Sequence, residues 1–143
     1  TLSRLHVSAK IAQKDASEFD PAYKGAFDAV LVDAPCSGLG LLGDKPDIRY
    51  SKSDADIVSL CALQKRILDA CCSYVAPGGV LVYATCTISR RENEETVEWF
   101  LSAHPEFTLE RMPFSLENEG MLQLLPQRHG TDGFFIARMR KCI

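Results

Sequence analysis

Two apolar segments separated by a helical pattern constrain the fold of this chain more than any other feature. Residues 26–32 and 80–84 are apolar almost throughout, which is typical of strands buried on both faces of a parallel sheet. Between them, apolar residues recur at helical spacing over 53–75, and Pro77-Gly78-Gly79 is expected to end this helix. A strand, a helix and a strand in this order predict an α/β fold with a parallel sheet.

The segments on either side of the first strand have weaker patterns. Residues 9–14 have a weak strand pattern and lead into a turn at Asp15-Ala16-Ser17. Residues 36–53 are rich in Gly, Ser, Asp and Pro and have neither a strand nor a helix period. They predict a long loop, and loops of this length in compact domains tend to carry function.

The last part of the chain predicts a helix followed by strands. Ser89 and Glu92 have the spacing of a capping box, so a helix is expected to begin there and to continue to about His104. In this interpretation Glu92 and Glu94 only cap the acidic first turn of the helix. Because no helical pattern separates the remaining strands, an antiparallel hairpin is expected on one edge of the sheet. These strands are predicted at 107–111, 122–125 and 133–140.

Composition and charge exclude several classes of protein. The chain has 143 residues, 46% hydrophobic and 24% charged, which suits one globular domain. Its apolar runs are much shorter than the ~20 residues of a membrane helix, and its start lacks the apolar stretch of a signal peptide. The net charge of −3 argues against a surface that is basic throughout. Basic residues nevertheless gather near the end of the chain, at Arg128, Arg138, Arg140 and Lys141. This basic group fits either a solvated strand end or a nucleic-acid contact.

Six cysteines could form three disulfides or a metal site, but their spacing supports neither. No two of them have the two-residue gap of a zinc knuckle, and no histidine lies at ligand spacing from any of them. Three belong to one apolar helical pattern, where a free thiol acts as a small buried side chain. We therefore expect no metal, free thiols and a reducing, cytoplasmic location. The six are Cys36, Cys61, Cys71, Cys72, Cys86 and Cys142.

Reactive side chains follow the carboxyl ends of the predicted strands. Asp15, Asp33, Cys36 and Cys86 all lie just past such an end. In open parallel sheets, ligands bind in the crevice beyond these ends. Two cysteines there, with Asp33 nearby, indicate covalent catalysis by a thiolate next to a carboxylate. The alternative is that both cysteines only fill tight turns.

Three motifs in order along the chain carry a resemblance to a known family. Asp33-Ala34-Pro35-Cys36-Ser37-Gly38-Leu39-Gly40 is similar to the fourth motif of the Fmu/Sun family of RNA cytosine-5 methyltransferases. Tyr83-Ala84-Thr85-Cys86-Thr87 resembles the sixth motif of that family. Residues 126–127 and 132–135 resemble its closing strand motif. The segments 46–50 and 92–94 follow the first two motifs, and the matches extend from Asp15 to Arg140.

The resemblance implies an S-adenosylmethionine-dependent, Rossmann-like class I methyltransferase fold. The sheet of this family has seven strands, of which the last pair forms an antiparallel hairpin. Residues 1–143 then correspond to the carboxy-terminal part of a single catalytic domain. The Gly-rich loop that holds the methionine end of the cofactor, and the acid that binds its ribose, would precede Thr1. We therefore expect the amino-terminal strands in a preceding segment of the same protein. The isolated chain is expected to be inactive, to bind the cofactor weakly and to associate through the unpaired edge of strand 26–32.

The resemblance also implies roles for individual residues. Cys86 corresponds to the nucleophile that attacks carbon 6 of cytosine, which makes carbon 5 electron-rich enough to accept a methyl group. Cys36 corresponds to the second cysteine, which helps to release the product. Asp33 corresponds to the acid that hydrogen-bonds the base, and we also assign it to the cofactor site. Asp15 corresponds to the residue that reads the adenine amino group of the cofactor.

The resulting prediction is an RNA cytosine-5 methyltransferase that acts on ribosomal RNA. A first alternative keeps the enzyme class and changes the substrate to transfer RNA or to DNA; in the DNA case Cys36 would be the nucleophile. A second alternative is a methyltransferase-like domain without catalytic activity that binds RNA or a partner.

Overall fold

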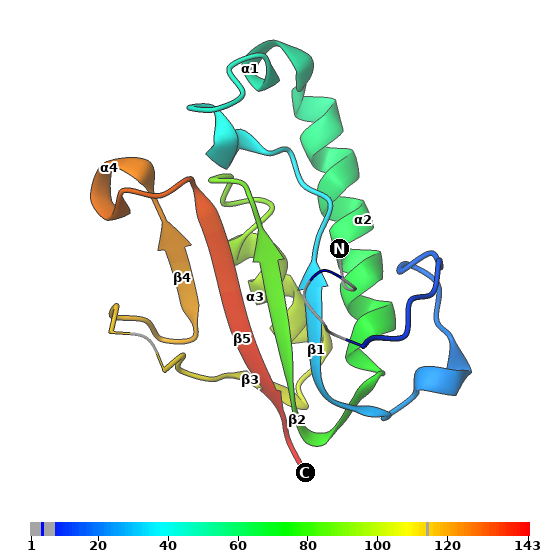
Figure 1. The fold of residues 1–143 in the computed structure, drawn as a ribbon. Coiled ribbons are helices and arrows are strands. Elements are labelled where there is room, and N and C mark those ends of the chain that lie inside the picture. Colours follow the sequence, from blue (N-terminus) through cyan, green and yellow to red (C-terminus); the bar gives the residue numbers. More distant parts are fainter. Residues whose placement is uncertain (1–3, 5–7, 114) are drawn as a thin grey trace.

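A parallel β-α-β unit forms one side of the sheet in the computed structural model, which describes residue 4, residues 8–113 and residues 115–143 (Figure 1). It consists of β1 (Phe27–Asp33), α2 (Asp54–Cys72) and β2 (Val75–Thr85). α2 starts where the helical spacing of the sequence predicts, and the structure adds a reciprocal capping box of Ser53 and Asp56 at this point. The predicted β-α-β unit is confirmed.

Pro77-Gly78-Gly79 does not end α2, which already stops at Cys72. These residues lie inside β2, where Phe27 pairs with Val75 but Ala29 pairs with Val80. The extra residues of β2 bulge out of the ladder at this point, and Gly78 adopts a left-handed backbone (φ 73°) that suits glycine.

The other side of the sheet is antiparallel, and β5 (Phe134–Lys141) is its central strand. β5 lies antiparallel to β2 on one side and to β3 (Phe107–Leu109) and β4 (Met121–Leu124) on the other. The strand order is β1-β2-β5-β3, with β4 also paired to β5. Four strands therefore run in one direction and β5 runs in the other. The predicted α/β sheet, mostly parallel with an antiparallel end, is confirmed.

Several local predictions are wrong. Residues 9–14 form no strand, since they pair with no other strand among the described residues. The loop predicted at 36–53 contains a 3-10 turn (Leu39–Leu41) and the short helix α1 (Ile48–Ser51). A second short helix, α4 (Pro126–His129), lies between β4 and β5; it begins with Pro and is capped by Gly130. A further 3-10 turn, Pro21–Tyr23, precedes β1.

The helix predicted from Ser89 begins later, as α3 (Glu94–Ala103). Its first turn is acidic as expected, because it contains Glu94 and Glu95. The capping box of Ser89 and Glu92 is not formed, since the Glu92 carboxylate is buried and bonds to residues of another loop.

The core lies between one face of the sheet and both α2 and α3. Tyr83, Phe135 and Met139 on this face are fully buried against Leu68 of α2 and Phe100 of α3. Burying each large apolar side chain of this kind stabilises the fold by roughly 1.5–3 kcal/mol. On the other face most of the alternate side chains of β2 and β5 are half-buried, while Val80 is buried and Phe134 is exposed. The helices therefore cover one face of the sheet.

β1 is the edge strand of the sheet. Among the described residues it pairs only with β2, and Leu31 and Phe27 are 68% and 41% exposed. Such an apolar edge favours association with another strand. That the isolated chain associates through this edge stays a prediction.

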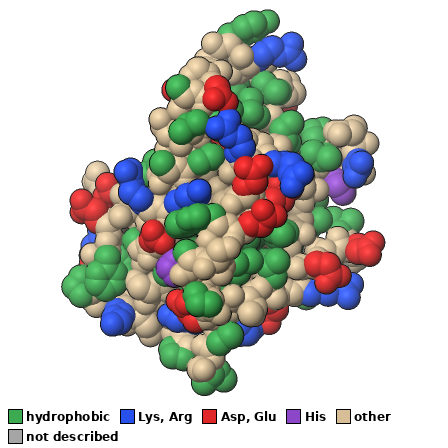
Figure 2. Space-filling model, turned by 180° about the vertical axis from the view of Figure 1, so that it is seen from behind, with side chains coloured by type: hydrophobic (Ala, Val, Ile, Leu, Met, Phe, Trp, Pro, Cys, Tyr) green, Lys and Arg blue, Asp and Glu red, His purple; other side chains and the backbone are tan. Residues whose placement is uncertain are grey.

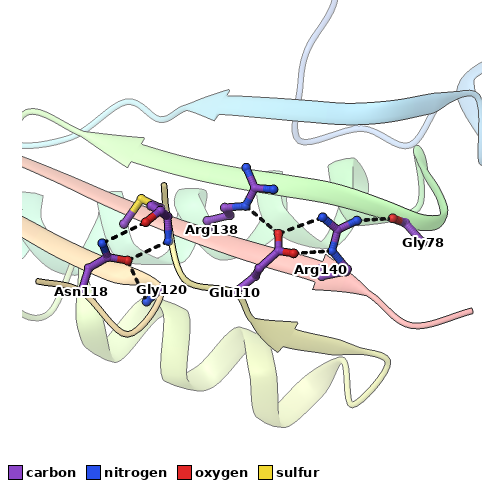
Figure 3. Close-up of polar contacts among 7 residues, drawn as sticks. Gly78, Glu110, Asn118, Gly120, Arg138 and Arg140 are labelled. Carbon is purple, nitrogen blue, oxygen red and sulfur yellow. Dashed lines mark hydrogen bonds and ion pairs between the residues drawn. The ribbon is translucent and has the colours of Figure 1, made fainter. Parts of the chain in front are cut away.

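Two members of the basic group near the end of the chain, Arg138 and Arg140, are bound to a carboxylate of the fold (Figure 3). Glu110 accepts hydrogen bonds from Arg138 and Arg140, each at 2.6 Å, and Arg140 also donates to the carbonyl of Gly78. The arginines lower the pKa of Glu110, with Arg140 as the larger cause. These contacts lie at the end of β2 opposite to Cys86, which favours a structural role for Arg138 and Arg140.

The outer surface carries mixed charges. On the face opposite to that of Figure 1, acidic and basic side chains are interspersed with apolar ones (Figure 2). In the part of the chain that the structure describes, no helix combines the length and apolar character needed to cross a membrane.

Candidate active site

The two cysteines that the sequence places past strand ends are in contact. Cys36 lies three residues after β1 and Cys86 directly follows β2. Their Sγ atoms are 3.2 Å apart, and the backbone N–H of Cys86 donates to Cys36 Sγ at 3.3 Å. Both side chains are partly buried and both thiols are free. The structure thus brings together two thiols that are 50 residues apart in the sequence.

The Cys36 thiol is strongly affected by its burial. Burial raises the pKa of Cys36 well above its usual range, and the neighbouring Cys86 thiol raises it further. Cys36 therefore stays protonated near neutral pH. A protonated thiol at this distance can donate a hydrogen bond to Cys86 Sγ.

Asp33 and Asp15 line one cavity, whose wall includes Pro35, the residue before Cys36. Asp33 ends β1 and is exposed, and Asp15 precedes the turn at 16–17. The cavity has a volume of about 480 Å³, and Leu31, Ile67 and Pro35 form part of its wall. Its size falls in the range of small-molecule sites.

The chemistry of the cavity suits an adenine ring with its amino group. Asp15 accepts hydrogen bonds from the Ser17 hydroxyl (2.7 Å) and backbone N–H (2.8 Å), and these bonds lower its pKa. An ionised carboxylate has further acceptor sites for an amino group. The apolar wall offers surface to a flat ring, so the residues present fit part of a nucleoside cofactor.

A buried carboxylate connects the two loops that carry the cysteines. Glu92 is fully buried, and its carboxylate accepts hydrogen bonds from the Ser37 N–H (2.8 Å) and hydroxyl (2.6 Å). Thr87 Oγ1 donates to the same carboxylate at 3.3 Å, and Gln64 Nε2 of α2 at 3.2 Å. Sequence reasoning assigned Glu92 to a helix cap and missed this network. The available signal was that Ser37 and Thr87 directly follow the two cysteines.

Two glycines allow a third loop to reach the site. The N–H of Gly40 donates to the carbonyl of Cys86 (3.0 Å), and the N–H of Gly133 donates to the carbonyl of Gly40 (2.9 Å). A Cβ atom on Gly40 would lie 1.9 Å from the carbonyl oxygen of Gly133. The backbones can approach this closely only without a side chain at residue 40. All three motifs that carry the resemblance therefore meet at this end of the sheet.

We expect Gly40→Ala to lower the free energy of unfolding by about 1–3 kcal/mol, because its Cβ would collide with rigid backbone. Chemical unfolding of the full-length protein measures the change. Gly43→Ala is the matched control, since nothing lies within 4 Å of a Cβ at residue 43, and it should change stability by less than about 0.5 kcal/mol. Equal stabilities of the two variants would contradict the packing described here.

The remaining cysteines lie away from the site. Cys71 and Cys72 are buried in the core, and Cys142 is exposed beyond β5. Cys61 lies on α2 and is partly buried. Among the described residues, no three His, Cys, Asp or Glu side chains gather as a metal site would require.

The comparisons with known proteins all point to one family. The sequence profile described as "16S rRNA methyltransferase RsmB/F" matches residues 1–140. The chain is 42% identical to the probable ribosomal RNA small subunit methyltransferase B of Bacillus subtilis, over 98% of this chain and 32% of that protein. It is 40% identical to the ribosomal RNA small subunit methyltransferase F of Cronobacter sakazakii, over 89% of this chain and 28% of that protein. The chain thus spans about a third of the length of these relatives.

Solved structures agree with this assignment. The crystal structure of NSun6 from Pyrococcus horikoshii with SFG is similar with a TM-score of 0.81 and 29% identity, over 99% of this chain and 37% of that one. A methyltransferase homolog protein from the same organism gives a TM-score of 0.65 and 34% identity, over 80% of this chain and 39% of that one. These likenesses confirm the predicted methyltransferase fold and the expected family. The chain belongs to the RsmB/F family of 16S rRNA methyltransferases.

Proposed function

We propose that the protein containing this chain methylates carbon 5 of a cytosine in ribosomal RNA through a covalent bond to Cys86. The observation that carries the proposal is the contact of Cys36 and Cys86 beyond the carboxyl ends of neighbouring parallel strands. An aromatic carbon is a poor methyl acceptor until a nucleophile adds to the ring. A pair of thiols, one to form this bond and one to assist its cleavage, suits that chemistry.

The environment of Cys36 suits the assisting thiol, which leaves Cys86 as the proposed nucleophile. Cys36 is held protonated by burial, whereas a nucleophilic cysteine reacts as the thiolate. Addition of Cys86 Sγ to carbon 6 moves the ring electrons toward carbon 5. After methyl transfer, a base takes the proton from carbon 5, the C–H electrons re-form the double bond between carbons 5 and 6, and Cys86 Sγ leaves with the electrons of its bond to carbon 6. A hydrogen bond from the Cys36 thiol would stabilise the departing sulfur.

The aspartates are proposed to hold the base and the cofactor. S-adenosylmethionine supplies the methyl group when it is bound. Asp15 would accept from the adenine amino group at the cavity that it shares with Asp33. Asp33, at the end of β1, would hydrogen-bond the cytosine and border the cofactor. The fit of the cavity to a nucleoside and the methyltransferase family support this assignment.

The names of the relatives support ribosomal RNA as the substrate. Both the Bacillus subtilis and the Cronobacter sakazakii proteins are named for the RNA of the small ribosomal subunit. We therefore propose the RNA of the small ribosomal subunit as the substrate of the protein that contains this chain.

Methyl transfer to unmodified small-subunit RNA tests the proposal. The full-length protein is incubated with this RNA and with S-adenosylmethionine that carries an isotopically labelled methyl group, and the nucleosides are analysed by mass spectrometry. We expect labelled 5-methylcytidine, at a level that the remote control Cys142→Ser leaves unchanged. Label on another base or another ring position would refute the proposed chemistry. Binding of RNA without any label would favour a domain without catalytic activity.

A further inference from the structure

Each catalytic cysteine is followed in the sequence by a buried hydroxyl residue. Ser37 follows Cys36 and Thr87 follows Cys86, and these side chains are 2% and 0% exposed. Their hydroxyl oxygens lie 2.8 Å apart and both donate to one oxygen of the Glu92 carboxylate. The two loops are therefore joined one residue away from the two thiols.

Glu92 also accepts hydrogen bonds from α2 and β2. Gln64 of α2 donates to its carboxylate and also to the carbonyl of Pro35, the residue before Cys36. The hydroxyl of Tyr83 in β2 donates to the backbone carbonyl of Glu92 at 2.7 Å. In the described part of the chain, these hydrogen-bond partners of Glu92 are all neutral groups. The carboxylate is thus the common acceptor for α2 and for both cysteine loops.

We propose that Glu92 is a positioning residue that sets the distance between Cys36 and Cys86. Consecutive Cα atoms are about 3.8 Å apart, so a fixed Ser37 and a fixed Thr87 leave each neighbouring cysteine little freedom. Glu92 has no solvent-exposed surface and acts through these two residues rather than on a substrate. The consequence for methyl transfer rests on the function proposed above, whereas the geometric role does not.

Oxidation of the thiol pair measures its geometry without RNA or cofactor. Diamide takes up two electrons and two protons as Cys36 and Cys86 form a disulfide, and mass spectrometry of the linked peptides gives the rate. In the full-length protein we expect Glu92→Ala to slow this reaction roughly tenfold or more, because misplacement by about 1 Å can cost a large rate factor. Glu92→Gln keeps one acceptor oxygen, so its oxidation rate should lie between those of the wild type and Glu92→Ala. The matched control Glu95→Gln, at an exposed position in the first turn of α3, should oxidise at the wild-type rate.

The accompanying measurements separate positioning from simple stabilisation. Glu92→Gln should lower kcat for methyl transfer while the KM for RNA stays within about twofold. If Glu92→Ala melts at a lower temperature but oxidises at the wild-type rate, the role is structural only and the proposal is wrong. Failure of the wild-type pair to form the disulfide would overturn the proposal as well.

If Glu92→Ala does not fold, the variants Glu92→Gln and Thr87→Val test the proposal instead, and wild-type oxidation rates in both would refute positioning. A wild-type protein that makes no 5-methylcytidine would refute the proposed function and leave the oxidation result standing.

Discussion

Cys86→Ser is expected to abolish both the methylation of RNA and its covalent capture. A hydroxyl is far less ionised than a thiol near neutral pH, so the variant would lack the nucleophile proposed to add to carbon 6. The fold should be unaffected, because the Cys86 carbonyl that accepts from Gly40 belongs to the backbone. Labelled methyl incorporation and the melting temperature of the full-length protein measure the two effects.

A substituted RNA makes the covalent bond visible. With 5-fluorocytosine at the target, carbon 5 has no proton to lose, so the adduct with the wild-type protein should persist as a shifted band on a denaturing gel. Cys86→Ser should give no such band, while the control Cys142→Ser should give the wild-type band. A shifted band with Cys86→Ser would exclude Cys86 as the nucleophile.

The β-α-β unit could be predicted because its signals are local. The apolar run of β1, the helical spacing of α2 and the apolar run of β2 each depend on residues close in the sequence. Since parallel strands end at one edge of a sheet, the same signals also indicate that Cys36 and Cys86 lie near each other. The sequence therefore predicts the place of the site, and the structure adds the 3.2 Å contact.

Glu92 could not be assigned from local patterns. Its spacing from Ser89 is that of a capping box, but its partner Ser37 lies 55 residues earlier in the chain. In the interior, the Glu92 carboxylate accepts hydrogen bonds from two hydroxyl groups and a backbone N–H. These bonds replace the bond to the Ser89 backbone that a capping box would require. The same limit applies to Arg138 and Arg140, whose partner Glu110 precedes them by 28 and 30 residues.

Short elements were missed for a different reason. α1 and α4 contain four residues each, which is too few for a helical period to be visible in the sequence. Residues 9–14 show the reverse error: a strand was predicted there and none forms. A strand pattern gives a strand only where a partner strand completes the ladder. These errors concern the rim of the site and leave the positions of the two cysteines unchanged.

Cys36→Ser is expected to have the opposite effect to Cys86→Ser, with the protein–RNA adduct accumulating on ordinary cytosine. Cys86 remains able to attack carbon 6, so the covalent bond still forms. Release should be slow, because a hydroxyl is a weaker acid than a thiol and the shorter C–O bond draws its proton away from Cys86 Sγ. A denaturing gel of the variant with unmodified RNA should show a persistent shifted band, which the wild-type protein shows only with 5-fluorocytosine.

The comparison of the two variants decides which thiol forms the bond. Cys36 is held protonated by burial and lies 3.2 Å from Cys86, which suits a group that acts on the sulfur of its neighbour rather than on the base. Cys36→Ala should trap the adduct at least as strongly as Cys36→Ser, because it offers no proton at all. If Cys36→Ser instead lost the adduct while Cys86→Ser trapped it, Cys36 would be the nucleophile. The roles of the two cysteines would then be exchanged, as in the alternative in which a DNA cytosine is the substrate.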